Sequence, residues 1–194
     1  PGAKVMTMKV VFEKDTWKLL GAQIVGTEGV DKRLDVLATA MHAGMKANML
    51  KDLDLAYAPP FSSAKDPVNM AGFMIENIRN GFVKQYHWDE IAGLPRDGSV
   101  TLLDTRTAYE YKSGHIDGYI NIPVDDLRER MNEIDDSKPV YVICQSGLRS
   151  YIACRILTQN GFDCYNFSGG YRFYASVIHE KQMSECTYPC GMEK

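Results

Sequence analysis

A cysteine followed by a short loop is the strongest chemical signal in this 194-residue sequence. Cys144 ends the apolar run 140–143, and an amphipathic helix is expected to begin near Leu148. The N–H groups of the loop and of the helix N-terminus would converge on the sulfur, which favours a nucleophilic thiolate or a persulfide. Arg149 adds positive charge. The residues expected to form this persulfide or anion loop are Gln145, Ser146, Gly147, Leu148 and Arg149.

Two other interpretations of Cys144 were weighed against the nucleophile. The first is an inert buried thiol at a strand end, which is a common environment for cysteine. The second is a cysteine phosphatase, but phosphatases with this layout place five residues between cysteine and arginine, and four separate Cys144 from Arg149 here. The loop also contains no carboxylic acid to protonate a leaving alkoxide. The shorter loop therefore fits a single terminal sulfur better than a phosphate.

Alternating strands and helices are expected to position this loop. Helices are expected at 106–113, 125–134, 148–160 and after 170, and strands at 100–103, 119–122, 140–144 and 162–167. This alternation predicts an α/β domain with a parallel sheet and helices on both faces. Ligands bind outside the carboxyl ends of strands in such sheets, which is where Cys144 falls.

The first 80 residues show a different pattern of predicted elements. The alternating segment 6–13 and the apolar segment 19–25 predict a hairpin. Helical spacing follows at 30–44 and 48–55, and Asp66 with Pro67 predicts a capped helix start. This part therefore reads as a small α+β unit that precedes the α/β domain.

Residues of about 85–182 resemble a rhodanese domain. The matching pieces are 102–106 (LLDTR), 114–123 (GHIDGYINIP), the Cys144 loop and 168–171 (SGGY). The resemblance implies a sulfurtransferase in which Cys144 takes sulfane sulfur as a persulfide and passes it to a thiol or to cyanide. It also implies that Asp104 and Arg106, at a neighbouring strand end, support the loop.

Residues 1–80 resemble the C-terminal dimerisation domain of flavin-dependent pyridine nucleotide–disulfide reductases. Segments 28–33 (EGVDKR) and 57–72 (YAPPFSSAKDPVNMAG) carry the likeness, which is nearest to coenzyme A-disulfide reductase and NADH oxidase. The resemblance implies a homodimer formed through residues 1–80. It also implies that Tyr57 contacts the substrate in the partner subunit. Residues 183–194 would form a C-terminal tail.

No Gly-x-Gly-x-x-Gly fingerprint occurs, so this chain is expected to bind neither FAD nor NAD(P)H. The chain begins Pro1-Gly2, which we interpret as a piece of a longer protein whose missing N-terminal part holds both cofactors. The implied partners are a sulfane-sulfur donor and a thiol acceptor, with coenzyme A persulfide as a candidate.

The net charge of −3 without a basic cluster argues against a nucleic-acid partner, and no apolar run approaches a membrane span. The odd count of five cysteines fits a reducing compartment, so a cytoplasmic location is expected.

No metal is expected, since Cys186 and Cys190 would need two further zinc ligands and the nearest candidate is His179. Three interpretations of this cysteine pair stay open: a disulfide, a relay that accepts sulfur from Cys144, and a frayed terminal tail, which is favoured. A helically spaced methionine stripe is interpreted as core or interface packing, and it comprises Met41, Met45, Met49, Met70 and Met74.

Three functional hypotheses remain. The first is a sulfurtransferase domain acting through Cys144 in a fragment of a flavin-dependent coenzyme A-disulfide or persulfide reductase. The second is a module that holds a persulfide without turnover. The third is an assembly piece whose residues 1–80 keep the dimer together, and it is compatible with the first.

Overall fold

The computed structural model describes residues 4–59, 62 and 64–186 of the chain. The chain divides into two compact units, residues 1–81 and residues 82–194. Among the described residues, no helix is long and apolar enough to cross a membrane. Each unit has its own buried core, so each is described by itself.

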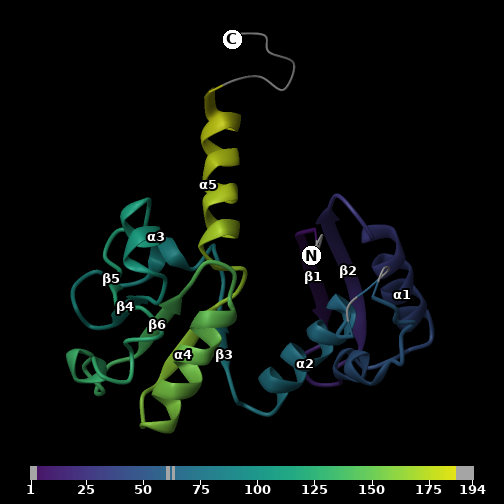
Figure 1. Cartoon of the computed structure of the whole chain (residues 1–194), viewed down its shortest axis with the longest axis horizontal. Coiled ribbons are helices and arrows are strands. Elements are labelled where there is room, and N and C mark those ends of the chain that lie inside the picture. Colours follow the sequence, from purple (N-terminus) through teal and green to yellow (C-terminus); the bar gives the residue numbers. More distant parts are fainter. Residues whose placement is uncertain (1–3, 60–61, 63, 187–194) are drawn as a thin grey trace. The chain divides into compact units, whose positions relative to one another are not determined.

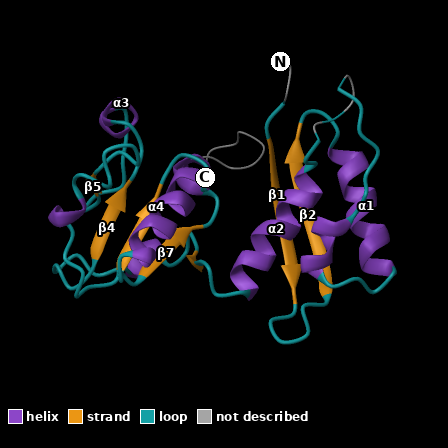
Figure 2. Ribbon diagram, turned by 60° about the horizontal axis from the view of Figure 1, so that its bottom comes forward, coloured by secondary structure: helices purple, strands orange, loops and turns teal. Residues whose placement is uncertain are grey.

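The first unit is a hairpin covered by helices (Figure 2). Strands β1 (Met6–Phe12) and β2 (Leu19–Gly26) pair in antiparallel fashion, as predicted. Helix α1 (Val30–His42) follows, and the second expected helix is a short 3-10 turn, η1 (Ala47–Asp52). Helix α2 (Pro67–Arg79) packs against η1.

The start of α2 has the predicted cap. The side chain of Asp66 accepts a hydrogen bond of 3.0 Å from the Val68 N–H, and Pro67 occupies the first helical position. Asp66 also pairs with Arg33 of α1 at 2.9 Å, which ties the two helices together. The buried core of this unit comprises Leu19, Leu37, Ala40, Ala47, Leu50, Val68 and Ile75.

The second unit contains a five-stranded parallel sheet with the strand order β3-β7-β6-β4-β5 (Figure 1). This confirms the predicted α/β fold with a parallel sheet. The strands are β3 (Lys84–Tyr86), β4 (Thr101–Asp104), β5 (Ile120–Asn121), β6 (Val140–Ile143) and β7 (Cys164–Phe167). The central strand β6 is the one that leads into Cys144.

Alternate residues of β6 face opposite sides of the sheet. Val140 and Val142 pack with residues of helix α4 (Leu148–Gln159). Tyr141 and Ile143 belong to a second cluster, which includes tyrosines of helix α5 (Gly170–Cys186). The sheet is therefore covered on both faces, and its central strand is anchored from both sides.

The expected helix at 125–134 is wrong. Hydrogen bonds there mostly join residues three apart, as from the Leu127 N–H to the Val124 carbonyl, and only a short 3-10 turn forms, η3 (Met131–Glu133). These turns keep Leu127 fully buried in the core under the sheet. Helix α3 (Ala108–Lys112) is shorter than expected, and α5 extends to residue 186, into the segment expected as a tail.

Candidate active site

Cys144 lies at the carboxyl end of β6 and is 1% exposed. Its Sγ accepts a hydrogen bond from the Gly147 N–H at 3.1 Å, and it shares the Ser150 hydroxyl with the Gly147 carbonyl, each at 3.2 Å. Both donors belong to the loop and first turn of α4, so the predicted convergence of donors on the sulfur is present. Two donors aimed at one sulfur stabilise negative charge on it.

Glycines allow the chain to fold this closely around the sulfur. Gly147 caps α4 with a φ of 107°, a left-handed conformation that side chains rarely adopt. Gly170 has a φ of 71°, and a Cβ there would lie 2.5 Å from the Ser146 backbone nitrogen. The start of α5 therefore packs directly on the loop, where the Tyr171 N–H donates to the Cys144 carbonyl at 2.8 Å.

Asp104 and Arg106 form a buried ion pair beside the loop. Asp104 is 0% exposed and Arg106 is 1% exposed, and their closest polar atoms are 2.7 Å apart. The Arg106 guanidinium also donates to the Gly114 carbonyl at 2.8 Å and lies 3.9 Å from the Tyr171 ring centroid. A further hydrogen bond from Arg106, 3.4 Å to the Gln145 side chain, connects the pair with the loop. The pair therefore lies beside the loop, and its role as loop support stays a prediction.

Arg149 is engaged by a carboxylate that the sequence reasoning did not anticipate. Its guanidinium donates two hydrogen bonds to Glu110 of α3, of 2.7 and 2.6 Å. Glu110 also accepts from the backbone N–H and the hydroxyl of Thr107. The hydrogen bonds from Arg149, opposed by partial burial and assisted by Thr107, lower the pKa of Glu110 to about 2. The charge that Arg149 was expected to add to the loop is therefore neutralised by Glu110.

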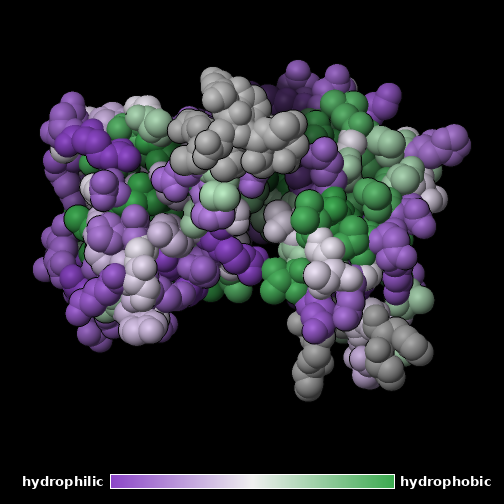
Figure 3. All heavy atoms as spheres, turned by 90° about the horizontal axis from the view of Figure 1, so that it is seen from above, coloured by the Kyte–Doolittle hydropathy of each residue, from purple (hydrophilic) through white to green (hydrophobic). Residues whose placement is uncertain are grey.

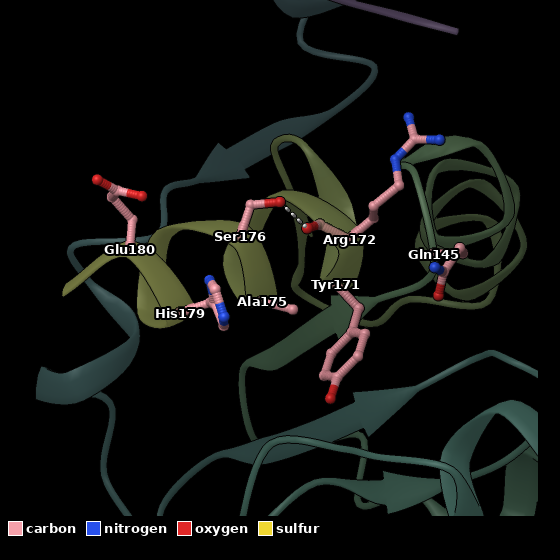
Figure 4. Close-up of a pocket in the computed structure, with 7 residues that line it drawn as sticks. All are labelled: Gln145, Tyr171, Arg172, Ala175, Ser176, His179 and Glu180. Carbon is pink, nitrogen blue, oxygen red and sulfur yellow. Dashed lines mark hydrogen bonds between the residues drawn. The ribbon is translucent and has the colours of Figure 1, made fainter. Parts of the chain in front are cut away.

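The remaining loop side chains differ in exposure. Ser146 and Leu148 are exposed, and Leu148 is 64% exposed, whereas Gln145 is half-buried. Beside Gln145 the surface opens into a pocket of about 550 Å³, which is lined mainly by one face of α5 (Figure 4). The pocket residues are Gln145, Tyr171, Arg172, Ala175, Ser176, His179 and Glu180.

Two further cysteines lie in the core. Cys154 of α4 and Cys164 of β7 are both buried. A hydrogen bond with Cys164 together with burial raises the pKa of Cys154, which keeps that thiol protonated. No group of three potential metal-binding side chains occurs among the described residues. Cys190 lies outside the described residues, so the relation between Cys186 and Cys190 stays a prediction.

Tyr57, expected at the substrate of a partner subunit, lies in the first unit and is 54% exposed. The methionine stripe is also mostly on the surface of that unit, with Met41, Met49, Met70 and Met74 each more than 40% exposed. In the space-filling view, apolar side chains gather on part of this unit (Figure 3). The exposure rules out core packing for these four methionines.

Sequence reasoning missed three groups that shape the site: Ser150, Glu110 and the backbone of Tyr171. The Thr-x-x-Glu pattern of Thr107 and Glu110 is a capping box, which signals the start of a helix but not the contact of Glu110 with Arg149. No sequence signal indicated Ser150 or Tyr171, since each reaches Cys144 only through the folding of the chain around the loop.

Comparisons with known proteins agree with this architecture. Residues 1–68 match the pyridine nucleotide-disulphide oxidoreductase dimerisation domain, and residues 87–176 match the rhodanese-like domain. Coenzyme A disulfide reductase of Staphylococcus epidermidis is 44% identical over 73 residues, which are 38% of this chain and 17% of that protein.

Two solved structures resemble both units. The crystal structure of reduced CoADR-RHD from Bacillus anthracis has 46% identity and a TM-score of 0.89, over 93% of this chain and 32% of that one. A NAD-dependent persulfide reductase from A. fulgidus has 38% identity and a TM-score of 0.76, over 89% of this chain and 31% of that one.

The chain spans 17% of the curated reductase's length and about a third of the two solved chains. The family matches cover its two parts separately, in the same order as the two compact units. The chain thus consists of a pyridine nucleotide-disulphide oxidoreductase dimerisation domain followed by a rhodanese-like domain.

Proposed function

We propose that Cys144 carries sulfane sulfur as a persulfide and delivers it to a thiol acceptor. The observation that carries this proposal is the pair of donors on its Sγ, the Gly147 N–H and the Ser150 hydroxyl. These donors support the thiolate that must attack the donor molecule and must leave again when sulfur is delivered.

The reaction has two balanced steps. In loading, the Cys144 thiolate attacks the outer sulfur of a donor persulfide, a new S–S bond forms, and the donor leaves as a thiolate. In delivery, an acceptor thiolate attacks the outer sulfur on Cys144, and the Cys144 thiolate is the leaving group. The acceptor's proton goes to solvent, and no net oxidation or reduction occurs. Gly147 and Ser150 stabilise the thiolate at the start and end of this cycle.

We further propose that this chain works as part of a flavin- and NAD(P)H-dependent disulfide or persulfide reductase. The reductase names of its relatives support this assignment. The described residues do not fit either cofactor themselves. The turn between β6 and α4 has one glycine, Gly147, and it encloses the Cys144 sulfur where a dinucleotide fold would hold a pyrophosphate. Both sulfur-transfer steps use only this chain, the sulfur donor and the acceptor.

Homodimerisation through the first unit is the third part of the proposal. The match to a dimerisation domain supports it, as does the exposure of Met41, Met49, Met70 and Met74. Apolar side chains gathered on one unit mark an interaction surface. Tyr57 at 54% exposure is free to reach a substrate in the partner subunit, as the reductase family implies.

A loading assay tests the central claim. The chain is incubated with polysulfide or thiosulfate, and intact-mass measurement with peptide mapping locates any added sulfur. Cyanide is then added and thiocyanate is measured. The Cys144→Ser variant provides the matched control, and a background with Cys186→Ser and Cys190→Ser removes two other thiols.

Sulfur on Cys144 with thiocyanate formation supports a sulfurtransferase. Sulfur on Cys144 without transfer to cyanide or thiols favours the alternative, a module that holds a persulfide without turnover. Failure of Cys144 to take up sulfur from either donor contradicts both, and the assembly role of residues 1–80 would then be the main one.

A further inference from the structure

Three arginines belong to the Cys144 loop or contact it, and two of them are paired with carboxylates. Arg106 is paired with the buried carboxylate of Asp104, and Arg149 is paired through two hydrogen bonds with Glu110. The third is Arg172, whose backbone N–H donates to the Gln145 carbonyl at 3.2 Å. Within the part of the chain that the structure describes, the Arg172 side chain makes no ion pair.

Arg172 also lines the pocket that opens beside the loop. Figure 4 shows Arg172 and Gln145 toward one end of this pocket, with His179 and Glu180 toward the other. Glu180 comes eight positions after Arg172, which is about 12 Å along a helix. Glu180 is therefore more than a Debye length from the loop end at physiological salt, so it does not offset the charge of Arg172 there.

We propose that Arg172 determines the substrate specificity of sulfur transfer by binding an anionic group of the thiol or persulfide that reacts with Cys144. The ligand class is a small thiol with a carboxylate, sulfonate or phosphate group, seated in the pocket along α5. This inference rests on the proposed function, since it requires a persulfide on Cys144. It assigns charge recognition to Arg172 of α5 and not to Arg149 of the loop.

The geometry separates charge recognition from the chemistry. The sulfur accepts hydrogen bonds from Gly147 and Ser150, whereas the pocket is lined by Gln145 and residues of α5. In delivery, the acceptor thiolate attacks the outer sulfur and the S–S bond to Cys144 breaks. Arg172 takes no part in that bond change. It lowers the free energy of the bound acceptor, so its effect belongs in KM and not in kcat.

Two acceptors of similar size provide the test, namely 3-mercaptopropionate with a carboxylate and 2-mercaptoethanol without charge. Cys144 is first loaded with polysulfide and the persulfide is confirmed by mass. Transfer rates to each acceptor are then measured for the wild type and for Arg172→Gln. The ratio of the two rates, compared between variants, cancels the intrinsic reactivity of the thiols.

We expect Arg172→Gln to lower kcat/KM for 3-mercaptopropionate about fivefold, through KM, and to leave 2-mercaptoethanol unchanged. This is the upper range for one partly exposed charge pair, and it should shrink as salt is added. Arg128→Gln removes an exposed arginine outside the pocket and is the matched control. Arg172→Glu should reverse the preference, so that cationic cysteamine gains over 3-mercaptopropionate. A glutamate in the first turn of α5 is compatible with the helix.

An unchanged ratio of the two rates in both Arg172 variants, with the persulfide present, overturns this inference alone. Absence of a persulfide on wild-type Cys144 overturns the proposed function together with it. An equal loss for both acceptors would show that Arg172 acts on the loop structure and not on ligand charge, which also refutes the inference.

Discussion

Replacing Glu110 with glutamine tests the ion pair that neutralises Arg149. The pKa of Glu110 is lowered from 4.5 to about 2, mainly by the hydrogen bonds from Arg149. A pKa change of this size corresponds to about 3.4 kcal/mol at 1.36 kcal/mol per pH unit. The two side chains are 31% and 29% exposed, so solvent screening reduces the contribution to about 1–2 kcal/mol.

The pH dependence has a definite sign. Glu110 has a lowered pKa in the folded protein, so the folded state binds fewer protons than the unfolded state between about pH 4.5 and pH 2. The stabilisation is therefore complete above about pH 4.5 and is lost as the pH falls toward about 2. The difference in unfolding free energy between the wild type and Glu110→Gln should be about 1–2 kcal/mol at pH 7 and should vanish near pH 2.

Urea unfolding followed by tryptophan fluorescence measures this difference. The chain has two tryptophans, and Trp17→Phe leaves Trp88 to report on the second unit alone. Glu133→Gln is the matched control, because the Arg130–Glu133 pair is exposed and involves no loop residue. This control should leave the unfolding free energy unchanged within error. A Glu110→Gln effect that is the same at pH 7 and pH 2 would refute the reasoning.

Three further changes probe the loop and its supports. Asp104→Asn should destabilise the second unit by about 3 kcal/mol in the same urea assay, because the buried charge of Arg106 loses its partner; a loss below about 1 kcal/mol would contradict the role assigned to the pair. Ser150→Ala removes one of the two donors on the Cys144 sulfur and should slow persulfide loading about tenfold, as measured by quenched mass spectrometry, while an unchanged rate would show that the hydroxyl is dispensable. Gly170→Ala places a Cβ 2.5 Å from the loop backbone at a φ of 71°, so loading should be lost while circular dichroism still shows a folded chain; wild-type loading would contradict this close packing.

The sheet and the position of Cys144 could be predicted because the pattern of neighbouring residues is enough to indicate the strands. The run 140–143 is apolar and ends at a loop with a glycine, and such a segment forms a buried strand in most surroundings. Strand β3 (Lys84–Tyr86) could not be predicted, since three residues with no alternation become a strand only by pairing with β7. The helix predicted at 125–134 was wrong for a related reason. Its helical spacing is real, but packing of Leu127 under the sheet favours successive turns.

The chemical environment of the loop was harder to predict than its location. Arg149 and Glu110 are 39 residues apart, and nothing local signals that they meet. The same holds for Tyr171, whose N–H reaches Cys144 only because Gly170 lets α5 approach the loop. Sequence reasoning therefore placed Cys144 at the end of a buried strand and Gly147 among the groups around its sulfur, and the role of Cys144 as nucleophile stays a prediction. The ion pairs around the loop join residues that are distant in the sequence, or depend on burial, so they could be found only in the folded structure.

Cys144 is 1% exposed, and this burial bears on how the sulfur resists oxidation. In the proposed persulfide, a second sulfur is bonded to Sγ at about 2 Å. The outer sulfur then carries the negative charge, so an oxidant reacts with it and not with Sγ. Oxidation of a bare thiolate to sulfinic or sulfonic acid is permanent, whereas the outer sulfur departs with each delivery. In the loaded site, Sγ is no longer a free thiolate, so the first oxidation falls on a sulfur atom that does not belong to the chain.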